Sequence, residues 1–391
     1  SEADYFENFY RTTVAQLVDS DPIDIAAVTG QVTLLNFAVP FNKKLLIFSD
    51  RVQYILDSAD ILSPKTAQLT YASAFNASET ISPIQVGPYV YFADDTGSNS
   101  KVFEYFVDND VNTENADEVS AQVPEYIKAP IQYMDGSSRL SSIFLLGNTS
   151  TEMYCYKYFQ GTQGKIQSSW GKWVFGGDVK YFTLVDNNIY LLIDYSGDGL
   201  YMETINIEED SVRTGTSFPL HLDHLFKFSD CTRAYDSATG LTTFTLPYPS
   251  PAGTKFVQTD ANDPKGFDIG VTRVSSTSFT AVGDYTGSTY NNAVIGRNFT
   301  FRYEYSPFFI KESKGQGQVS IQDGRLSLRY LSVQYEDTAQ FSARVTTRGR
   351  SPYTYTFSGR NLGSQNNILG ARGQRRLRCG HPRRGSGQVL A

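Results

Sequence analysis

The sequence has little of what most enzymes and disulfide-stabilised scaffolds depend on, because its 391 residues include only three Cys, three His and three Met. The three cysteines, Cys155, Cys231 and Cys379, lie far apart and match no metal or redox spacing, which argues against a disulfide-rich scaffold. No uninterrupted apolar run of about 20 residues is present, which argues against a helical membrane protein.

Motifs for catalysis are missing as well. There is no G-x-S-x-G elbow, Walker loop, H-E-x-x-H or C-x-x-C pair. Because His and Cys are the side chains that catalysis uses most, their scarcity favours a structural or binding role. The sequence therefore predicts that the protein is not an enzyme, with no catalytic residue, no cofactor-binding residue, no metal ligand and no cofactor.

Aromatic residues are abundant instead, with 26 Phe, 26 Tyr and 2 Trp beside 31 Gly and 15 Pro. Aromatic and β-branched side chains suit a pleated surface, and Gly and Pro suit turns. A disordered chain would lack this aromatic content. The composition predicts a soluble, mostly β protein of roughly two or three domains.

The net charge of −7 combines an acidic body with a basic tail. Residues 1–370 carry 28 basic against 41 acidic side chains, or −13, whereas residues 371–391 carry six Arg and no acid. An acidic body disfavours non-specific wrapping of nucleic acid but suits a wall past which a polyanion slides. The tail has no periodicity, so we predict that residues 371–391 are disordered or out of frame; a basic arm that binds nucleic acid is the alternative.

The amino-terminal residues predict one short amphipathic helix. Phe6, Phe9, Tyr10, Val14 and Leu17 recur at helical spacing, in a stretch from residue 4 to residue 19 that begins with a capping-box pattern. The chain begins without Met and without a signal-peptide pattern, so we expect a fragment of a longer protein that is not exported by a signal peptide. Residues 1–30 are assigned to this helix and a linker.

Residues 31–215 contain a repeated hairpin unit that predicts β-propeller-like blades. Each unit has an apolar strand, a polar turn and a Tyr-rich strand, and the first strands begin at residues 45, 89, 143 and 189. Steps of 44, 54 and 46 residues fit the period of propeller blades. Strands that face neighbours on both sides read as unbroken apolar runs. Separate β-sandwiches would show shorter and more even spacing. The predicted hairpins comprise residues 45–48 with 52–56, 89–92 with 102–106, 143–146 with 153–156, and 189–193 with 200–205.

Residues 216–370 lose the repeat and predict a further antiparallel β domain. Short strands are expected at 241–246, 256–257 and 267–274, and residues 299–305 alternate. A meander follows, with strand residues at 326–335 and a bulge near Tyr330, and Phe341, Ala343 and Val345 are expected to pair back before Tyr353, Tyr355 and Phe357. For the arginines on or beside this meander, a solvated outer face is favoured over a subunit contact; they are Arg325, Arg329, Arg344, Arg348 and Arg350.

Two segments contain possible metal ligands. Asp194–Gly199 resembles the start of a calcium loop, but Ile205 stands where the bidentate Glu is needed, so a hairpin turn is the favoured interpretation. His221, Asp223 and His224, with Cys231 beyond, match no established zinc spacing. We interpret them as ordinary polar residues at a strand edge.

Several segments together resemble the tail tubular protein B, or nozzle protein, family of T7-like podoviruses. The similarity runs in the family's order from the first residues to about Gly363. The segments that carry it are residues 12–24 (TTVAQLVDSDPID), 39–50 (VPFNKKLLIFSD), 62–66 (LSPKT), 169–173 (SWGKW), 305–311 (YSPFFIK) and 324–329 (GRLSLR).

This resemblance implies a structural component of the bacteriophage virion. It implies a homohexamer in the phage tail, a propeller in each subunit, a tail adaptor or gatekeeper protein and tail fibres as neighbours, and a channel that passes double-stranded DNA without sequence recognition into the host envelope at ejection. Family members are longer and begin upstream, and they differ from this chain beyond Gly370. The alternative function is a β-propeller enzyme or lectin that acts on host surface polysaccharide, because two glycosidase carboxylates have no fixed spacing.

Overall fold

The structure is a computed structural model. It describes residues 23, 34–57, 62–108, 113–161, 164–195, 199–207, 216–218, 220–250, 253–262, 264–305, 310–314, 317–321, 340–347, 351–358 and 385–390. The helix predicted over residues 4–19 and the meander strands predicted at 326–335 lie outside these residues.

The prediction of a mostly β protein is confirmed. The described residues form antiparallel sheets, and their only helical elements are two 3-10 turns, Phe228–Asp230 and Ser288–Tyr290. None of these residues belongs to a helix long and apolar enough to cross a membrane. The chain divides into two compact units, residues 1–209 and 210–391.

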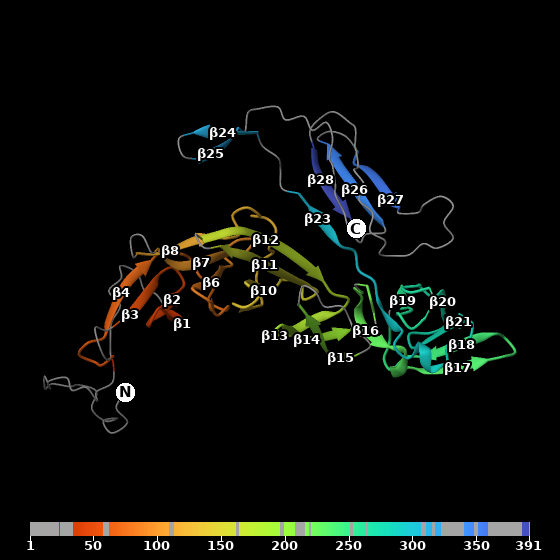
Figure 1. Ribbon diagram of the computed structural model, residues 1–391. Helices are drawn as coiled ribbons and strands as arrows, with labels where there is room; N and C mark the ends of the chain where they lie inside the picture. Colours follow the sequence, from red (N-terminus) through yellow and green to blue (C-terminus); the bar gives the residue numbers. More distant parts are fainter. Residues whose placement is uncertain are drawn as a thin grey trace, which may run out of the picture. The chain divides into compact units, whose positions relative to one another are not determined.

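In the first unit, the described residues form four antiparallel sheets, each a meander of consecutive strands (Figure 1). In chain order they are β1 (Leu35–Phe41), β2 (Lys44–Ser49), β3 (Gln53–Asp57) and β4 (Gln68–Ser73); β5 (Ile84–Val86), β6 (Tyr89–Asp94), β7 (Lys101–Asp108) and β8 (Thr113–Glu118); β9 (Tyr133–Ser137), β10 (Ser142–Leu146), β11 (Glu152–Gly161) and β12 (Gly164–Val174); and β13 (Asp178–Val185), β14 (Asn188–Tyr195) and β15 (Gly199–Asn206).

The four predicted hairpins are the second and third strands of these sheets. Strand β6 shows why its sequence is apolar throughout. Val90 and Phe92 belong to a buried cluster shared with the first sheet, whereas Tyr91 and Ala93 belong to a cluster shared with the third. Strand β10 behaves in the same way, because alternate residues pack toward the second and the fourth sheets. Both faces are buried, so no position of either strand is left for a solvent-facing polar residue.

We call the three buried clusters between consecutive sheets the first, second and third seams. The first seam is rich in stacked aromatics, with the rings of Phe92 and Phe103 5.2 Å apart and nearly parallel, and Phe48 at 5.2 Å from Phe92. Each fully buried large apolar side chain contributes roughly 1.5–3 kcal/mol, so the seams supply the main stabilisation of the first unit.

A recurring hydrogen bond from a backbone amide accompanies each seam. The turn that follows the second strand of one sheet accepts a hydrogen bond from the segment that leads into the next sheet. The Ala77 amide donates to the Asp50 carbonyl at 3.0 Å, the Ile131 amide to Asp95 Oδ1 at 3.2 Å, and the Val179 amide to the Ser150 carbonyl at 2.8 Å. The recurrence of this contact is the structural counterpart of the repeat in the sequence.

The second unit contains two sheets around an aromatic core. One sheet has the order β16-β22-β19, and the other has the order β17-β18-β21-β20. The rings of Phe228, Phe244, Phe256 and Phe279 form a chain of contacts with centroids 5.0–5.8 Å apart. The strands are β16 (Asp223–Lys227), β17 (Thr232–Asp236), β18 (Leu241–Thr245), β19 (Thr254–Val257), β20 (Val271–Arg273), β21 (Ser278–Val282) and β22 (Val294–Arg297).

The carboxy-terminal strands include the two that were predicted around Phe341–Val345 and Tyr353–Phe357. Phe341, Ala343 and Val345 of β26 (Gln340–Thr347) pair with Phe357, Tyr355 and Tyr353 of β27 (Tyr353–Ser358). The same sheet includes β23 (Arg302–Glu304) and β28 (Gly385–Leu390), whereas β24 (Ile310–Lys314) and β25 (Gly317–Ile321) form a separate hairpin.

Strand β28 (Gly385–Leu390) lies within residues 371–391, the tail that was predicted to be disordered or out of frame. The strand pairs with β26 on one side and β23 on the other. Backbone hydrogen bonds along a free strand edge require no side-chain pattern, so the absence of periodicity in the tail did not reveal this strand.

Gly136 of β9 offers a test of how closely the second seam is packed. A Cβ atom at this position would lie 2.6 Å from Val86 Cγ2 and 3.0 Å from Ile143 Cγ2. We therefore predict that Gly136→Ala lowers the free energy of unfolding by about 1–3 kcal/mol. Urea denaturation followed by tryptophan fluorescence measures it.

The matched control is Gly171→Ala in β12, where the nearest atom to an added Cβ is 4.0 Å away. It should leave stability unchanged or slightly improved. Equal effects of the two substitutions would contradict the tight packing of Gly136.

Candidate functional site

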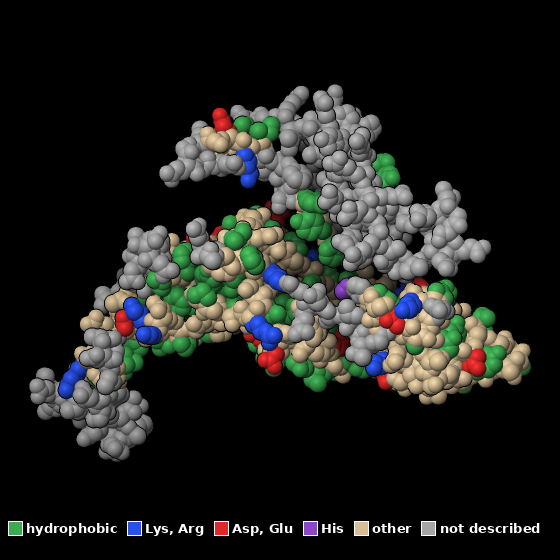
Figure 2. Space-filling view, viewed as in Figure 1, with side chains coloured by type: hydrophobic (Ala, Val, Ile, Leu, Met, Phe, Trp, Pro, Cys, Tyr) green, Lys and Arg blue, Asp and Glu red, His purple; other side chains and the backbone are tan. Residues whose placement is uncertain are grey.

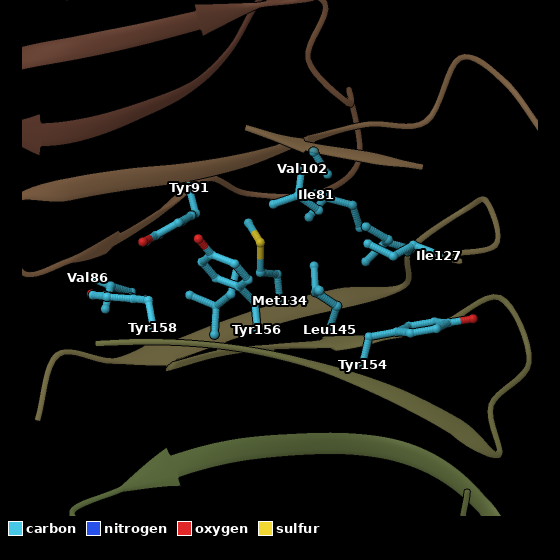
Figure 3. Packing of buried hydrophobic residues seen from close by; sticks show 13 residues of the cluster. Ile81, Val86, Tyr91, Val102, Ile127, Met134, Leu145, Tyr154, Tyr156 and Tyr158 are labelled. Atoms are coloured by element: carbon cyan, nitrogen blue, oxygen red, sulfur yellow. The ribbon is translucent and has the colours of Figure 1, made fainter. Parts of the chain in front are cut away.

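A cluster of ionisable and aromatic side chains lies in the second seam, and we call it the Lys165 cluster. It joins the second sheet, through strands β6 and β7, to the third, through β11 and β12. Figure 3 shows the buried hydrophobic side chains of the second seam, among them Tyr91, Tyr156 and Tyr158. Its members are Tyr89, Tyr91, Glu104, Tyr156, Tyr158 and Lys165.

Hydrogen bonds connect the two sheets through the buried Glu104 carboxylate, whose residue is 6% exposed. Lys165 Nζ donates to Glu104 Oε2 and, at 3.2 Å, to the Tyr156 hydroxyl oxygen. The Tyr91 hydroxyl donates to the same carboxylate oxygen at 2.5 Å. Charge-assisted hydrogen bonds of this kind are stronger than neutral ones.

Three tyrosine rings surround the ammonium group of Lys165. Its Nζ atom lies 4.6 Å from the ring centroid of Tyr158, 4.9 Å from that of Tyr89 and 5.3 Å from that of Tyr156. A cation within about 6 Å of an aromatic face is attracted by the ring quadrupole, and more strongly where water is excluded. The rings therefore compensate part of the cost of placing the ammonium group in the seam.

A β-bulge brings Lys165 into this position. In the β11–β12 hairpin, Phe159 pairs with Gln167 and Gln160 pairs with Lys165, so Ile166 has no partner across the ladder. The extra residue reverses the alternation of side chains along β12. Trp170 faces the seam, and regular alternation from it would place Ile166 there; with the bulge, Lys165 faces the seam and Ile166 is 71% exposed.

The pKa values of Tyr89, Tyr91, Tyr158 and Lys165 all lie above their ordinary values. Burial raises the pKa of Tyr91 far above its ordinary value of 10.0, and the negative charge of Glu104 raises it further. Burial also raises the pKa values of Tyr89 and Tyr158. For Lys165, burial lowers the pKa, but the hydrogen bond and charge of Glu104 outweigh burial, so its pKa lies above 10.5. The phenols of Tyr89, Tyr91 and Tyr158 are therefore neutral, and the Lys165 amine is charged, at neutral pH.

The arrangement has the chemistry of a cross-link between two sheets. The Glu104 carboxylate oxygen that faces Lys165 accepts bonds from an ammonium and a phenol, and the ammonium is enclosed by rings. A general base or a nucleophile must be free to reach a substrate proton or a reacting atom. These groups are instead engaged with one another across the seam.

The calcium-like segment lies in a hairpin, in agreement with the turn interpretation. Asp194 is near the end of β14 and forms an ion pair with Lys180 at 3.4 Å, while Gly199 begins β15 with a positive φ of 113°. Tyr195 pairs with Gly199 across the ladder. Residues 196–198 lie outside the described residues.

The structure does not bring the zinc-like residues into a metal-binding group. His221 is exposed, and the His224 ring packs edge-on against Tyr248 at 4.5 Å. Cys231 is buried, with its Sγ donating to the Lys227 carbonyl at 3.7 Å. Across the described part of the chain, no group of three or more His, Cys, Asp or Glu side chains is placed to hold a metal ion.

Of the five arginines predicted on or beside the meander, Arg344 lies on β26 and is exposed. The other four, Arg325, Arg329, Arg348 and Arg350, lie outside the described residues.

The Lys165 cluster was not predicted from the sequence. Glu104 and Lys165 are separated by 61 residues, and neither belongs to a known motif. A usable signal was present in two Tyr-x-Tyr pairs, Tyr89 with Tyr91 and Tyr156 with Tyr158, which place tyrosines on one face of strands from neighbouring repeats.

Comparison with known proteins gives one strong similarity at the level of families. A family model described as "Bacteriophage nozzle protein" matches residues 1–380. The tail tubular protein gp12 of Escherichia phage T7 is 28% identical over 398 aligned residues, which cover 99% of this chain and 48% of the relative. The chain therefore spans about half the length of that curated relative.

Solved structures resemble the chain only weakly. Hsv2p of Kluyveromyces lactis is 8% identical, with a TM-score of 0.29 and coverage of 59% of this chain and 70% of its own. Hydrazine synthase of Kuenenia stuttgartiensis is 12% identical, with a TM-score of 0.27 and coverage of 58% and 60%. These likenesses are too low to inform fold or function.

Removing the ammonium group should destabilise the second seam. We predict that Lys165→Met lowers the free energy of unfolding by about 3 kcal/mol, because Glu104 is then buried without its cation. Both tryptophans, Trp170 and Trp173, lie in β12, so fluorescence-detected urea unfolding reports on this sheet directly.

The double variant Glu104→Gln with Lys165→Met should be less destabilised than Lys165→Met alone, because no unpaired charge remains. Lys157→Met, at an exposed position of β11, should cost less than about 1 kcal/mol. If Lys165→Met had the same free energy of unfolding as Lys157→Met, the Lys165 cluster would not stabilise the fold.

The raised pKa values also predict a loss of stability in alkali. A group whose pKa is higher in the folded state than in the unfolded state stabilises the fold. Its full contribution is present at pH values below the unfolded-state pKa and declines as the pH rises above that value. With ordinary values of 10.0 for Tyr and 10.5 for Lys, the urea midpoint should be constant to about pH 9.5 and fall steeply above about pH 10.

Tyrosinate absorbance recorded at each pH checks the cause, because Tyr91 should ionise only as the first unit unfolds. The urea midpoint should fall less steeply with pH in Tyr91→Phe than in the wild type. In Tyr235→Phe, which removes an exposed phenol, it should fall as steeply as in the wild type. An unchanged urea midpoint at about pH 11 would rule out this linkage.

Proposed function

The chain belongs to the bacteriophage nozzle protein family, and from this premise we propose that it is a structural subunit of a short-tailed phage tail nozzle that forms part of the channel for genome ejection. Its place is the virion tail. Because the chain covers 48% of the T7 relative, the partners and activity of the whole protein form part of this proposal.

One structural observation supports the proposal most strongly. The sheets of the first unit are joined in series by three seams, which bury both faces of the inner sheets. A wall that contains DNA has to resist deformation. Close-packed cores transmit load with little compression, and the Lys165 cluster adds a polar cross-link in the middle seam.

Surface properties are consistent with a subunit that assembles with other proteins. Large hydrophobic side chains are exposed in the last sheet of the first unit, including Val185, Leu200 and Met202. On the face shown in Figure 2, charged side chains occur in small scattered groups between neutral and hydrophobic ones. Exposed hydrophobic side chains of this size are available for contact with other proteins. The proposed partners are further copies of the chain in a hexameric ring, a tail adaptor or gatekeeper protein, and tail fibres.

The proposed role toward DNA is passive. Residues 1–370 carry a net charge of −13, so the body repels the phosphate backbone and binds it weakly. Double-stranded DNA would pass without sequence recognition and without adhering, toward the host envelope at ejection. No cofactor and no catalytic step are needed for this role.

The alternative, a propeller enzyme or lectin acting on host surface polysaccharide, is not favoured. The family and the T7 relative are described as nozzle and tail tubular proteins. The buried carboxylate of the Lys165 cluster is engaged by Lys165 and Tyr91. We propose accordingly that the protein is not an enzyme.

Electron microscopy of the full-length protein, mixed with the tail adaptor protein of the same phage, tests the proposal. The expected result is a ring of identical subunits attached to the adaptor with an open axial channel. A protein that remains monomeric in the presence of the adaptor would refute it.

The same preparation, incubated with host envelope polysaccharide, distinguishes the alternative. The nozzle proposal predicts no release of reducing sugars above a boiled control. Sugar release that is lost on substitution of a carboxylate pair would favour the enzyme instead.

A further inference from the structure

The fourth sheet of the first unit has one described strand fewer than the three sheets before it. Each earlier sheet has four strands in chain order, whereas the last has β13, β14 and β15. The first strands of consecutive sheets contact one another, β1 with β5, β5 with β9 and β9 with β13, so the sheets are aligned and the position beside β15 is the one that no described strand fills. Among the described strands, β15 pairs with β14 alone, and its outer edge offers backbone donors and acceptors.

In the earlier sheets, the fourth strand helps to close the seam behind it. Ala116 of β8 is buried in the first seam, and Trp170 of β12 packs on the second, where its indole nitrogen donates to the Val119 carbonyl at 2.9 Å. No described strand does the same for the third seam. Phe159 lies on the same face of β11 as Cys155, which packs on the third seam, yet Phe159 is 64% exposed. The third seam is therefore left partly uncovered.

The outer face of the fourth sheet is apolar up to the free edge. Tyr181, Leu192 and Met202 are cross-strand neighbours on β13, β14 and β15, on the face opposite the third seam. Met202 is 76% exposed, and Leu200, on the same face of β15, is exposed as well. An added strand beside β15 would extend this apolar row by one cross-strand neighbour.

A hairpin in the second unit also has free edges. Strands β24 and β25 form a two-stranded sheet that pairs with no other described strand. Ile310 pairs with Ile321 and Glu312 with Val319, so the three apolar side chains share one face, and Ile310 and Val319 are exposed. Because an isolated two-stranded hairpin is marginally stable in water, pairing with a further strand would stabilise this one.

The two free edges belong to segments of opposite charge. Residues 178–206, which span the fourth sheet, contain five acidic side chains and one basic, a net charge of −4. Residues 310–321, which span the hairpin, contain two lysines and one acid, a net charge of +1. Electrostatic attraction therefore favours this hairpin beside β15 over a second copy of β15, which would bring two acidic sheets together.

We propose that the β24–β25 hairpin of one subunit adds to the free edge of β15 in the neighbouring subunit, with its apolar face beside Met202. This inference rests on the proposed nozzle function and names the contact that joins the subunits. A head-to-tail ring requires two different, complementary surfaces on every subunit, and the acidic edge and the basic hairpin are such a pair. Strand addition binds through backbone hydrogen bonds, while alternate side chains set the register.

Cross-linking in the assembled ring tests this contact. Isotopically labelled full-length protein with Met202→Cys is mixed with unlabelled protein with Val319→Cys, assembled on the adaptor protein and treated with a short bis-maleimide. Both variants carry Cys379→Ser. Burial raises the pKa values of Cys155 and Cys231 to about 12, which keeps these thiols unreactive at neutral pH. Mass spectrometry should find peptides that join a labelled segment around position 202 to an unlabelled segment around position 319.

The matched control replaces Met202→Cys with Val282→Cys, at a position of β21 that is 77% exposed, and it should give no mixed peptide. Rings that form without the mixed peptide at position 202, or a cross-link found only when both cysteines are in one chain, would overturn the proposed contact and leave the nozzle function standing. A preparation that forms no ring would refute both.

Met202→Lys gives an independent measure. The side chain is exposed, so the free energy of unfolding of the subunit should stay unchanged, but the substitution removes an apolar contact and opposes a cation to the basic hairpin. The protein concentration at half-assembly should rise by about fivefold or more. Val282→Lys should leave this concentration unchanged, and equal assembly by the wild type and Met202→Lys would overturn the proposal.

Discussion

A β-sheet in the interior of a stack has to bury both of its faces, and the rest of the first unit depends on this constraint. It determines that β6 and β10 are apolar at nearly every position, because each residue faces one neighbouring sheet or the other. It also explains why tyrosine is so common here. A tyrosine ring fills a seam, while its hydroxyl can reach a polar partner at the edge. The Lys165 cluster is the extreme case, in which phenols, a carboxylate and an ammonium share one seam.

A physical reason separates the strands that could be predicted from the sequence from those that could not. The second and third strands of each sheet carry continuous or alternating apolar residues, and all four predicted hairpins are present. The first and fourth strands were harder to recognise. Strand β5 is only Ile84–Val86, and β8 reads TENADE, a polar edge strand with no apolar stripe. Strand β28 is Gly- and Ser-rich and depends on pairing with distant residues. Strands of this kind form because a neighbouring strand offers backbone hydrogen bonds along its free edge, and their own side-chain pattern contributes little.

The polar features show a similar limit. Glu104 and Lys165 meet only because two sheets stack and a bulge rotates β12 by one position, and no local pattern encodes both events. The sequence motifs for metals, in contrast, pointed to segments that the structure places in a hairpin turn and beside a tyrosine ring.

Alternation along β6 and β10 has a consequence for how such a protein changes over generations. Odd- and even-numbered positions of one strand belong to different seams, so substitutions that refit one seam leave the other untouched. Two surfaces can therefore drift independently although a single short segment encodes both. Deleting or inserting one residue would affect both seams, because every later side chain of the strand would then face the opposite seam. Lineages of this fold are expected to accumulate replacements in these strands while keeping their lengths constant.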